Sequence, residues 1–271
     1  MNIIKAIIER RSVRSFNGEC LTPDQTDILQ KAIDDSSSPF GGNVSIRLRH
    51  FGSKGEYRPS TYGVIRGACD YFLIAMGPDD HSALSAGFRF EQVVLKAWRL
   101  GLGTCWIAAT FKGSDFDRAE IWPSGESLKI ISPVGVASKQ SLIEKVTRMT
   151  LGSKRRKPFD QLFFSDDFTH PLDRNNTFAR SLDMLRLAPS STNSQPWRAV
   201  VTNDKVRFYY IPKSKLSILD CGIGLCHFHE CEKHLGHNGI FVDEAAVDNA
   251  PSRWKYLITY RREVYLDSTR P

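Results

Sequence analysis

This chain of 271 residues lacks the features that mark exported and membrane-spanning proteins. No stretch approaches the roughly 20 consecutive apolar residues of a membrane span. The first eleven residues contain several charged side chains and only short apolar pairs, unlike the apolar region of a signal peptide. With no export signal, the six cysteines are expected to be reduced thiols, and we expect a cytoplasmic protein with no membrane partner.

Common motifs for nucleotide and zinc binding are missing as well. There is no Gly-x-Gly-x-x-Gly fingerprint, no phosphate loop ending in Gly-Lys-Ser and no Cys-x-x-Cys pair. His227, Cys231 and His234 would share one helical face, but helix-surface histidines and buried thiols are the commoner interpretation, so no metal ligand is assigned. Ser190 and Ser191 have no base visible in the sequence, and no catalytic residue is assigned.

The distribution of charge argues against a nucleic-acid partner. A net charge of +7 at pH 7 raises the question, because polyanions are bound through clustered lysines and arginines. Most basic residues are scattered among acidic ones, and the two compact clusters, at residues 10–14 and 154–157, contain no interleaved aromatic side chains. Together these clusters could bind one phosphate, or they could be cations at a helix end and a solvated basic loop.

Local signals predict helices and strands along the whole chain. Thr22, Pro23 and Gln25 form a capping box with proline at the first helical position, which predicts a helix start. Between residues 85 and 100 apolar side chains mark one helical face, and Glu91 belongs to the opposite, polar face that we expect at the surface. The other expected segments are a helix at 2–10, strands at 44–49, 71–76 and 104–109, an apolar run at 129–137, and a strand pair at 200–210.

Residues 166–176 are the best candidate for a joint between two halves. The segment is polar, contains Pro171 and has little apolar periodicity. It divides the chain into an N-terminal half, residues 1–165, and a C-terminal half, residues 166–271, which could also intertwine as one compact domain.

The order of elements is expected to repeat after the joint. We interpret the repeat as a degenerate internal duplication, so that the chain is a pseudo-dimer whose interface sites take residues from both halves. The matched segments are 86–90 with 221–225, Leu100-Gly101 with Leu235-Gly236, and 104–107 with 239–242.

The most distinctive stretch is Pro189-Ser190-Ser191-Thr192-Asn193-Ser194-Gln195-Pro196-Trp197. Its small hydroxyl and amide side chains both donate and accept hydrogen bonds, and its two prolines restrict the backbone. An apolar run follows immediately, which predicts a polar cradle at the entry to a buried strand. Composition alone is equally typical of an ordinary turn.

Three segments of this chain resemble the signature segments of the FMN-dependent nitroreductases. They are residues 10–16 (Arg-Arg-Ser-Val-Arg-Ser-Phe), residues 100–107 (Leu-Gly-Leu-Gly-Thr-Cys-Trp-Ile) and residues 189–197, and the basic residues 154–158 look like the family's C-terminal phosphate-binding segment. Here the well-formed cradle follows the basic segment, a reversal of the family's order. The chain is therefore most similar to the single-chain, duplicated branch of nitroreductase-like proteins.

The resemblance implies an α+β, nitroreductase-like fold. It would consist of two degenerate α/β repeats with central, antiparallel-type sheets, and with helices packed at an internal pseudo-dimer interface. It also implies an FMN site in which Arg14 places positive charge near the reduced ring and residues 106–108 offer backbone donors near N5. The implied cofactor-binding residues are Arg10, Arg11, Ser12, Arg14, Trp106, Ile107, Ala108, Lys154, Arg156, Pro189, Ser190, Ser191 and Asn193.

The mirror-related site is expected to be broken, which predicts one FMN per chain. Its cradle at residues 37–43 lacks the Gln-Pro-Trp ending, and its basic motif at residues 177–180 has one arginine.

The resemblance further implies two alternating half-reactions. NADH or NADPH would pass hydride to the flavin, and a small-molecule acceptor such as a nitroaromatic or a quinone would then be reduced. The alternative is a flavin-binding or degenerate protein that keeps the fold without turnover. An internal pseudo-dimer is compatible with a monomer, and higher assembly stays open.

Overall fold

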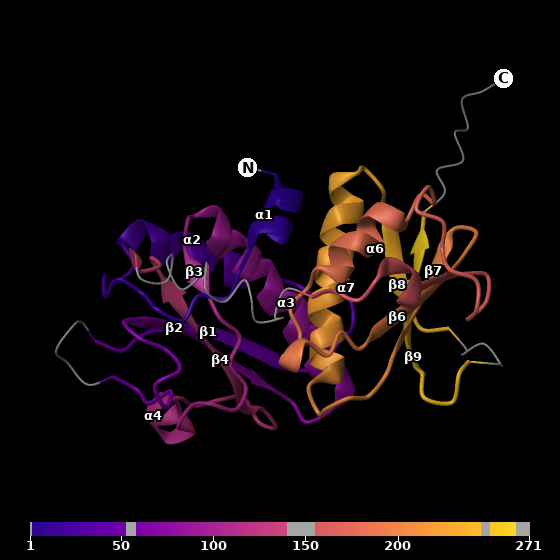
Figure 1. Cartoon of the computed structure of the whole chain (residues 1–271). Coiled ribbons are helices and arrows are strands. Elements are labelled where there is room, and N and C mark those ends of the chain that lie inside the picture. The colour runs from indigo at the N-terminus through magenta and orange to yellow at the C-terminus, as the bar shows by residue number, and fades with distance from the viewer. Residues whose placement is uncertain (1, 53–57, 140–154, 245–249, 264–271) are drawn as a thin grey trace. The chain divides into compact units, whose positions relative to one another are not determined.

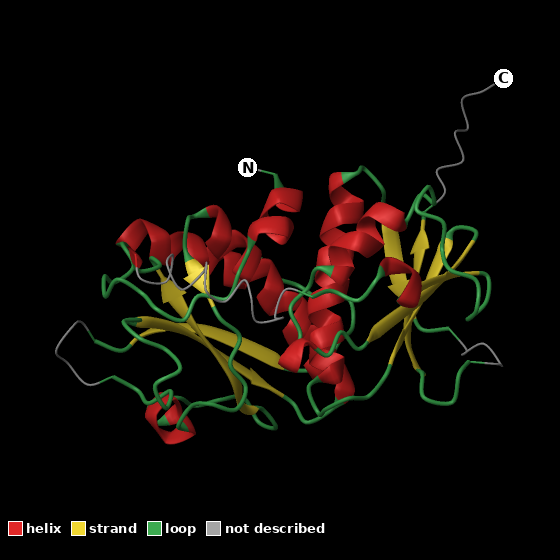
Figure 2. Ribbon diagram, viewed as in Figure 1, coloured by secondary structure: helices red, strands yellow, loops and turns green. Residues whose placement is uncertain are grey.

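The computed structural model describes residues 2–52, 58–139, 155–244 and 250–263. The chain forms two compact units, Met1–Arg155 and Arg156–Pro271, and the division falls earlier than the joint expected at residues 166–176. Each unit contains one sheet with helices packed against it (Figure 1; Figure 2). The expected α+β class is confirmed.

The first unit is built on a four-stranded antiparallel sheet with the order β1-β2-β4-β3. The central strand β2 is almost entirely buried, as expected for a run of apolar residues. The strand expected at residues 104–109 is shorter in the structure: after β3 only Ile107 forms a further bridge, to Ile131. The strands are β1 (Val44–His50), β2 (Asp70–Met76), β3 (Gly103–Thr104) and β4 (Ser127–Gly135).

The described residues of the first unit form four helices, and the longest of these, α3, packs against the sheet and against two other helices (Figure 2). The capping box at Thr22 and Gln25 is confirmed, with both reciprocal hydrogen bonds formed. The expected solvent position of Glu91 is wrong, because its side chain on α3 is 0% exposed. The helices are α1 (Ile3–Glu9), α2 (Pro23–Asp34), α3 (Asp80–Arg99) and α4 (Gly113–Asp117).

The second unit is built on a five-stranded sheet with the order β5-β6-β7-β9-β8. The pairs are antiparallel except β5 with β6, which is parallel. The hairpin predicted at residues 200–210 is confirmed as β6 and β7. The strands are β5 (Phe163–Ser165), β6 (Trp197–Thr202), β7 (Lys205–Tyr210), β8 (Gly239–Val242) and β9 (Lys255–Arg262).

Two α-helices, α6 (Ala179–Arg186) and α7 (Ser217–His234), pack against each other in the second unit. Helix α7 is buried over most of its surface, so its histidines and cysteines do not form a solvent-facing row. His227, for example, is buried and its Nδ1 lies 3.2 Å from the carbonyl oxygen of Met184 on α6. The described residues of this unit also form two short 3-10 helices, η1 (Phe159–Gln161) and η2 (Ser191–Asn193).

The two units share an order of elements. In each, a helix precedes an antiparallel pair of strands, and a long helix follows the pair. Two more strands then join the sheet, and the later one lies next to the pair, in the orders β1-β2-β4-β3 and β6-β7-β9-β8. The C-cap residues of the long helices are Leu100 and Leu235, and the glycines that follow, Gly101 and Gly236, have φ of 78° and 80°. This shared order favours the predicted internal duplication, which itself stays a prediction.

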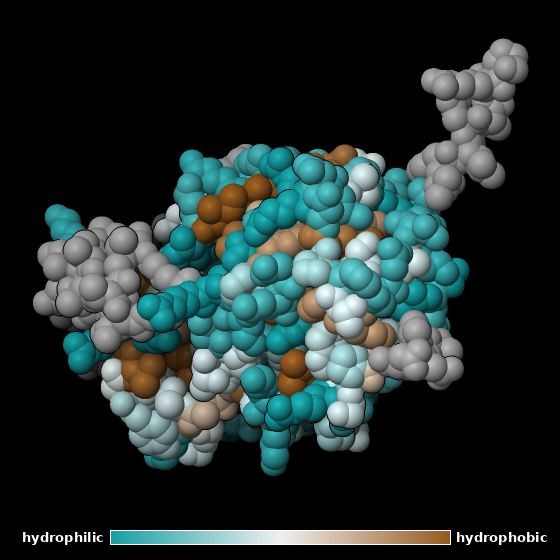
Figure 3. Space-filling view, turned by 45° about the vertical axis from the view of Figure 1, so that its right-hand side comes forward, coloured by the Kyte–Doolittle hydropathy of each residue, from teal (hydrophilic) through white to brown (hydrophobic). Residues whose placement is uncertain are grey.

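Among the described residues, no helix combines the length and the apolar character needed to cross a bilayer. The face drawn in Figure 3 carries mainly hydrophilic residues, with hydrophobic ones in separate patches.

Candidate functional site

In the first unit, the arginine-rich segment (residues 10–16) lies directly beside the Leu-Gly motif (residues 100–107). Ser12 forms a parallel bridge with Thr104, and the Val13 N–H donates to the Thr104 carbonyl at 2.8 Å. The approach is so close that a Cβ on Gly103 would lie 2.5 Å from a methyl carbon of Val13. Glycine at position 103 is therefore required by packing between two motifs that are about 90 residues apart in sequence.

Arg10 is buried and bound within its own unit. Its Nε lies 3.5 Å from Glu91 Oε1 on α3, and the Trp106 indole N–H donates to Glu91 Oε2 at 2.9 Å. Arg10 and Glu91 are 6% and 0% exposed, so the pair is shielded from solvent. The structure thus brings together two of the expected cofactor-binding residues, Arg10 and Trp106, through a glutamate that the sequence did not single out.

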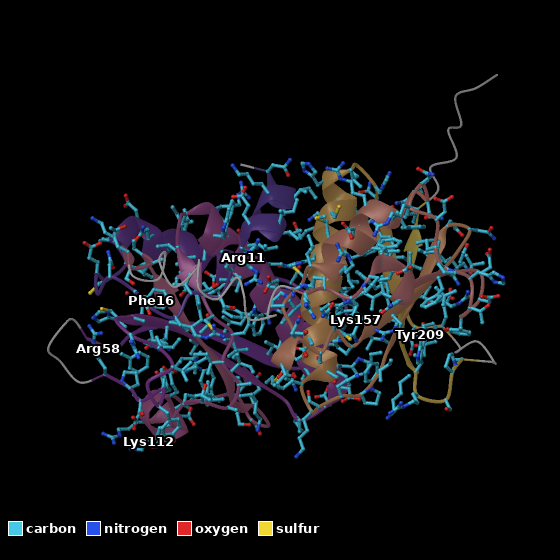
Figure 4. All side chains as sticks on the ribbon, viewed as in Figure 1. Arg11, Phe16, Arg58, Lys112, Lys157 and Tyr209 are labelled. Carbon is cyan, nitrogen blue, oxygen red and sulfur yellow. The ribbon has the colours of Figure 1, made fainter. Side chains whose placement is uncertain are left out.

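Three other polar residues of the arginine-rich segment, Arg11, Ser12 and Arg14, are exposed. Arg11, labelled in Figure 4, donates through Nη1 to the carbonyls of Ile8 and Arg10 at 2.6 and 2.7 Å, which binds the C-terminal end of α1. Ser12 and Arg14 are exposed, and within the described part of the chain Arg14 makes no side-chain hydrogen bond or ion pair. Arg14 is therefore available to a ligand.

The segment expected to pass beside the flavin ring is partly engaged in the sheet. The Ile107 N–H donates to the Ile131 carbonyl at 3.0 Å, and the Ile107 carbonyl accepts from the Ile131 N–H at 2.9 Å. Ile107 is buried, whereas Trp106 and Ala108 on either side are partly exposed. Its backbone donor is committed within the first unit, so Trp106 and Ala108 are the residues of this segment that could reach a ligand.

In the second unit, the polar cradle has an unusual backbone. Thr192, Asn193 and Gln195 have φ of 50°, 55° and 47°, in the left-handed region that side chains other than glycine seldom occupy. Conformations of this kind cost free energy and persist only where surrounding contacts enforce them. The cradle is therefore a defined structure, and its role as a binding site stays a prediction.

A buried carboxylate supports the cradle from α7. Both oxygens of Asp220 lie 3.0 Å from the Ser191 backbone nitrogen, and the Ser194 hydroxyl lies 3.5 Å from Oδ2. Ser190 adds a local bond, because its hydroxyl accepts from the Gln195 N–H at 3.0 Å. These contacts account for the left-handed residues that lie between Ser190 and Gln195.

The basic segment that begins the second unit also contacts the cradle. Arg156 donates to Asn193 Oδ1 and to the Leu187 carbonyl, both at 3.0 Å. The Lys157 N–H donates to Gln195 Oε1 at 2.7 Å, and its ammonium donates to the Ser194 carbonyl at 3.1 Å. The structure therefore joins two motifs that the sequence showed separately, while Lys154 lies outside the described residues.

Burial changes the protonation of two groups around the cradle. Burial raises the pKa of Asp220 to about 7, against the lowering effect of the bonds from Ser191 and Ser194. Burial, together with the positive charges of Arg198 and Lys213, lowers the pKa of Lys157 to about 8. Both groups can thus change charge close to neutral pH.

Sequence reasoning missed Asp220 and misplaced Glu91. An aspartate in the first turn of a helix is a common surface feature, so the sequence offers no strong signal that Asp220 is buried beneath the cradle. The periodicity of residues 85–100 assigned Glu91 to the polar face, because pairing with a distant arginine leaves no local pattern. Within the described residues, no group of three His, Cys, Asp or Glu side chains is arranged to bind a metal ion.

Comparison with protein families identifies the chain. The family model described as "Putative TM nitroreductase" matches residues 2–231. The chain belongs to this family. The expected similarity to nitroreductases is confirmed. None of the curated proteins compared matches the chain.

Solved structures give the same fold. A putative nitroreductase from Thermotoga maritima superimposes with a TM-score of 0.61 at 18% identity, covering 97% of this chain and 93% of its own. At this identity the similarity shows the fold, and the expected nitroreductase-like fold is confirmed. A putative nitroreductase in complex with FMN from Desulfovibrio desulfuricans aligns less closely, with a TM-score of 0.46 at 18% identity over 61% of this chain and 97% of its own.

Proposed function

We propose that this protein is an FMN-dependent NAD(P)H oxidoreductase that reduces a small acceptor such as a nitroaromatic or a quinone. Membership of a nitroreductase family supports an oxidoreductase in general. The observation that carries the proposal is the cradle: three left-handed non-glycine residues are held in place by Asp220, Arg156 and Lys157. Strain of this kind is characteristic of ligand-binding sites.

The chemistry of the residues fits FMN. The exposed Arg14 offers a guanidinium, and the exposed Ser12 a hydroxyl, of the kind that bind phosphate and the polar edge of a flavin. Within the second unit, the cradle by itself offers the hydroxyls of Ser190 and Ser191. Arg11 contributes positive charge at the same segment while it binds the end of α1.

When bound, FMN supplies the chemistry of accepting a hydride and passing it on. The residues of the chain then have three tasks: to fix the cofactor, to exclude competing reactions and to stabilise negative charge. Arg14 would perform the third, because its guanidinium carries a positive charge and several hydrogen-bond donors. No residue of the chain has to act as a dedicated acid or base.

A second candidate function has an observation of its own. Arg10 is paired with Glu91, and Arg156 is bonded to Asn193 and a carbonyl, so two expected phosphate ligands already bind protein groups. This arrangement favours a protein that keeps the fold and binds flavin weakly, without turnover.

Titration with FMN tests the proposal. We expect the purified protein to quench FMN fluorescence with saturation at one equivalent. Arg14→Ala should weaken the affinity about tenfold, because one charge-assisted hydrogen bond is lost. Arg99→Ala, which removes another exposed arginine of the first unit, is the matched control and should leave the affinity unchanged.

Anaerobic reduction separates the two candidates. An oxidoreductase bleaches its bound FMN when NADH or NADPH is added, and reoxidises it when a quinone follows. A binding protein without turnover keeps the oxidised spectrum in the presence of both nicotinamides. Absence of any FMN binding would reject both.

A further inference from the structure

Two cysteines of the first unit lie where separate parts of the chain meet. The segment at residues 18–21 runs along the start of β2. The Cys69 thiol donates to the Gly18 carbonyl at 3.3 Å, and the Leu21 N–H donates to Asp70 Oδ2 at 2.9 Å. Residues on both sides of Cys20 therefore contact Cys69 and Asp70.

The side chains themselves are in contact. The Cys20 thiol is hydrogen-bonded to the Cys69 thiol. Burial, and to a smaller extent this bond, raises the pKa of Cys69 to about 11. Cys20 is exposed, whereas Cys69 is 1% exposed. One thiol is thus open to a dissolved oxidant, and its neighbour is protected from it.

Arg58, labelled in Figure 4, provides positive charge at the pair. Its Nη2 lies 3.9 Å from Cys69 Sγ, and its charge opposes the rise in the pKa of that thiol. The guanidinium offsets part of the cost that burial imposes on a Cys69 thiolate when this thiol attacks another sulfur.

We propose that Cys20 and Cys69 are a redox-sensitive pair that forms a reversible intramolecular disulfide with hydrogen peroxide. The Cys20 thiolate attacks one peroxide oxygen, the O–O bond breaks, and a sulfenic acid and water result after protonation. Cys69 then attacks Cys20 Sγ, the S–S bond forms, and the sulfenic oxygen leaves as water with the thiol proton. Two thiols are oxidised and one peroxide is reduced to two waters.

The bond would link two elements that the fold holds only by non-covalent contacts. It would close a loop from residue 20 to residue 69 and tie the segment between the arginine-rich motif and α2 to β2. A loop of this length loses much conformational freedom in the unfolded chain when it is cross-linked. The oxidised protein should therefore unfold at a higher temperature than the reduced one.

The test is thiol counting on the full chain. Reduced protein is treated with a small excess of peroxide, denatured, alkylated and measured by mass spectrometry. We expect the wild type to lose two alkylation sites, with a peptide that links Cys20 to Cys69, and dithiothreitol should restore both sites. The Tm should rise on oxidation and fall on reduction.

Variants make the result specific. Cys20→Ser and Cys69→Ala should each abolish the cross-linked peptide and the oxidation-dependent rise in Tm. Cys226→Ala, at a buried cysteine of the second unit, should leave both unchanged. Retention of all six alkylation sites in the wild type, a link between other cysteines, a dimer linked through Cys20, or oxidation of Cys20 alone would overturn the proposal.

Discussion

Replacing Asp220 with asparagine should stabilise the second unit at neutral and alkaline pH. Asp220 is 2% exposed, and burial raises the pKa of its carboxyl from 3.8 to about 7. A carboxyl whose pKa is higher in the folded state binds its proton more tightly there. Its contribution to stability is therefore greatest below about pH 4, declines between pH 4 and 7, and is lost above pH 7.

The size of the effect follows from the shift. About three pH units at 1.36 kcal/mol each give a cost of about 4 kcal/mol for the ionised carboxylate above pH 7. Asparagine has nearly the same shape, keeps an oxygen for the Ser191 N–H and carries no charge. The free energy of unfolding of Asp220→Asn minus that of the wild type should therefore increase by about 3 kcal/mol as the pH rises from 5 to 8.

Urea unfolding of both proteins from pH 5 to pH 9 measures this difference. The exposed Asp160→Asn is the matched control in the same unit and should show no such pH dependence. If Asp220→Asn is less stable than the wild type at pH 8, or differs from it equally at every pH, the carboxylate is well stabilised and our reasoning from burial is wrong.

Two further predictions concern the first unit. Gly103→Ala should cost about 1 to 3 kcal/mol of stability, because its Cβ would overlap Val13. Gly113→Ala, with open space around it, is the control and should cost much less. Equal changes in Tm for the two variants would contradict the packing argument. Glu91→Gln should cost about 3 kcal/mol of stability, because it leaves the buried Arg10 without its carboxylate. In a double-mutant cycle, adding Arg10→Met should recover part of this stability. Strict additivity of the two changes would show that the residues do not interact.

Elements with local signals could be predicted from the sequence. The capping box at Thr22, the hairpin at residues 200–210 and the glycine after each long helix depend on neighbouring residues, and all three are found in the structure. The parallel pairing of β5 with β6 could not be predicted, because it joins segments that are more than 30 residues apart and share no turn.

The candidate site was predicted only in outline. The sequence singled out the arginine-rich segment and the cradle by their composition. It could not show that Arg10 pairs with Glu91, or that Asp220 lies beneath Ser191, because both contacts depend on how α3 and α7 pack. Burial of a charged group is a property of the tertiary structure, and here it determines which arginines remain available to a ligand.

The central claim is that this chain binds and uses FMN, and one measurement tests it most directly. Protein saturated with FMN and freed of excess cofactor is mixed anaerobically with NADPH or NADH while its visible spectrum is recorded. The account predicts about one flavin per chain, bleached by at least one nicotinamide and restored by a quinone. A chain that retains no flavin, or retains flavin that neither nicotinamide reduces, would contradict it.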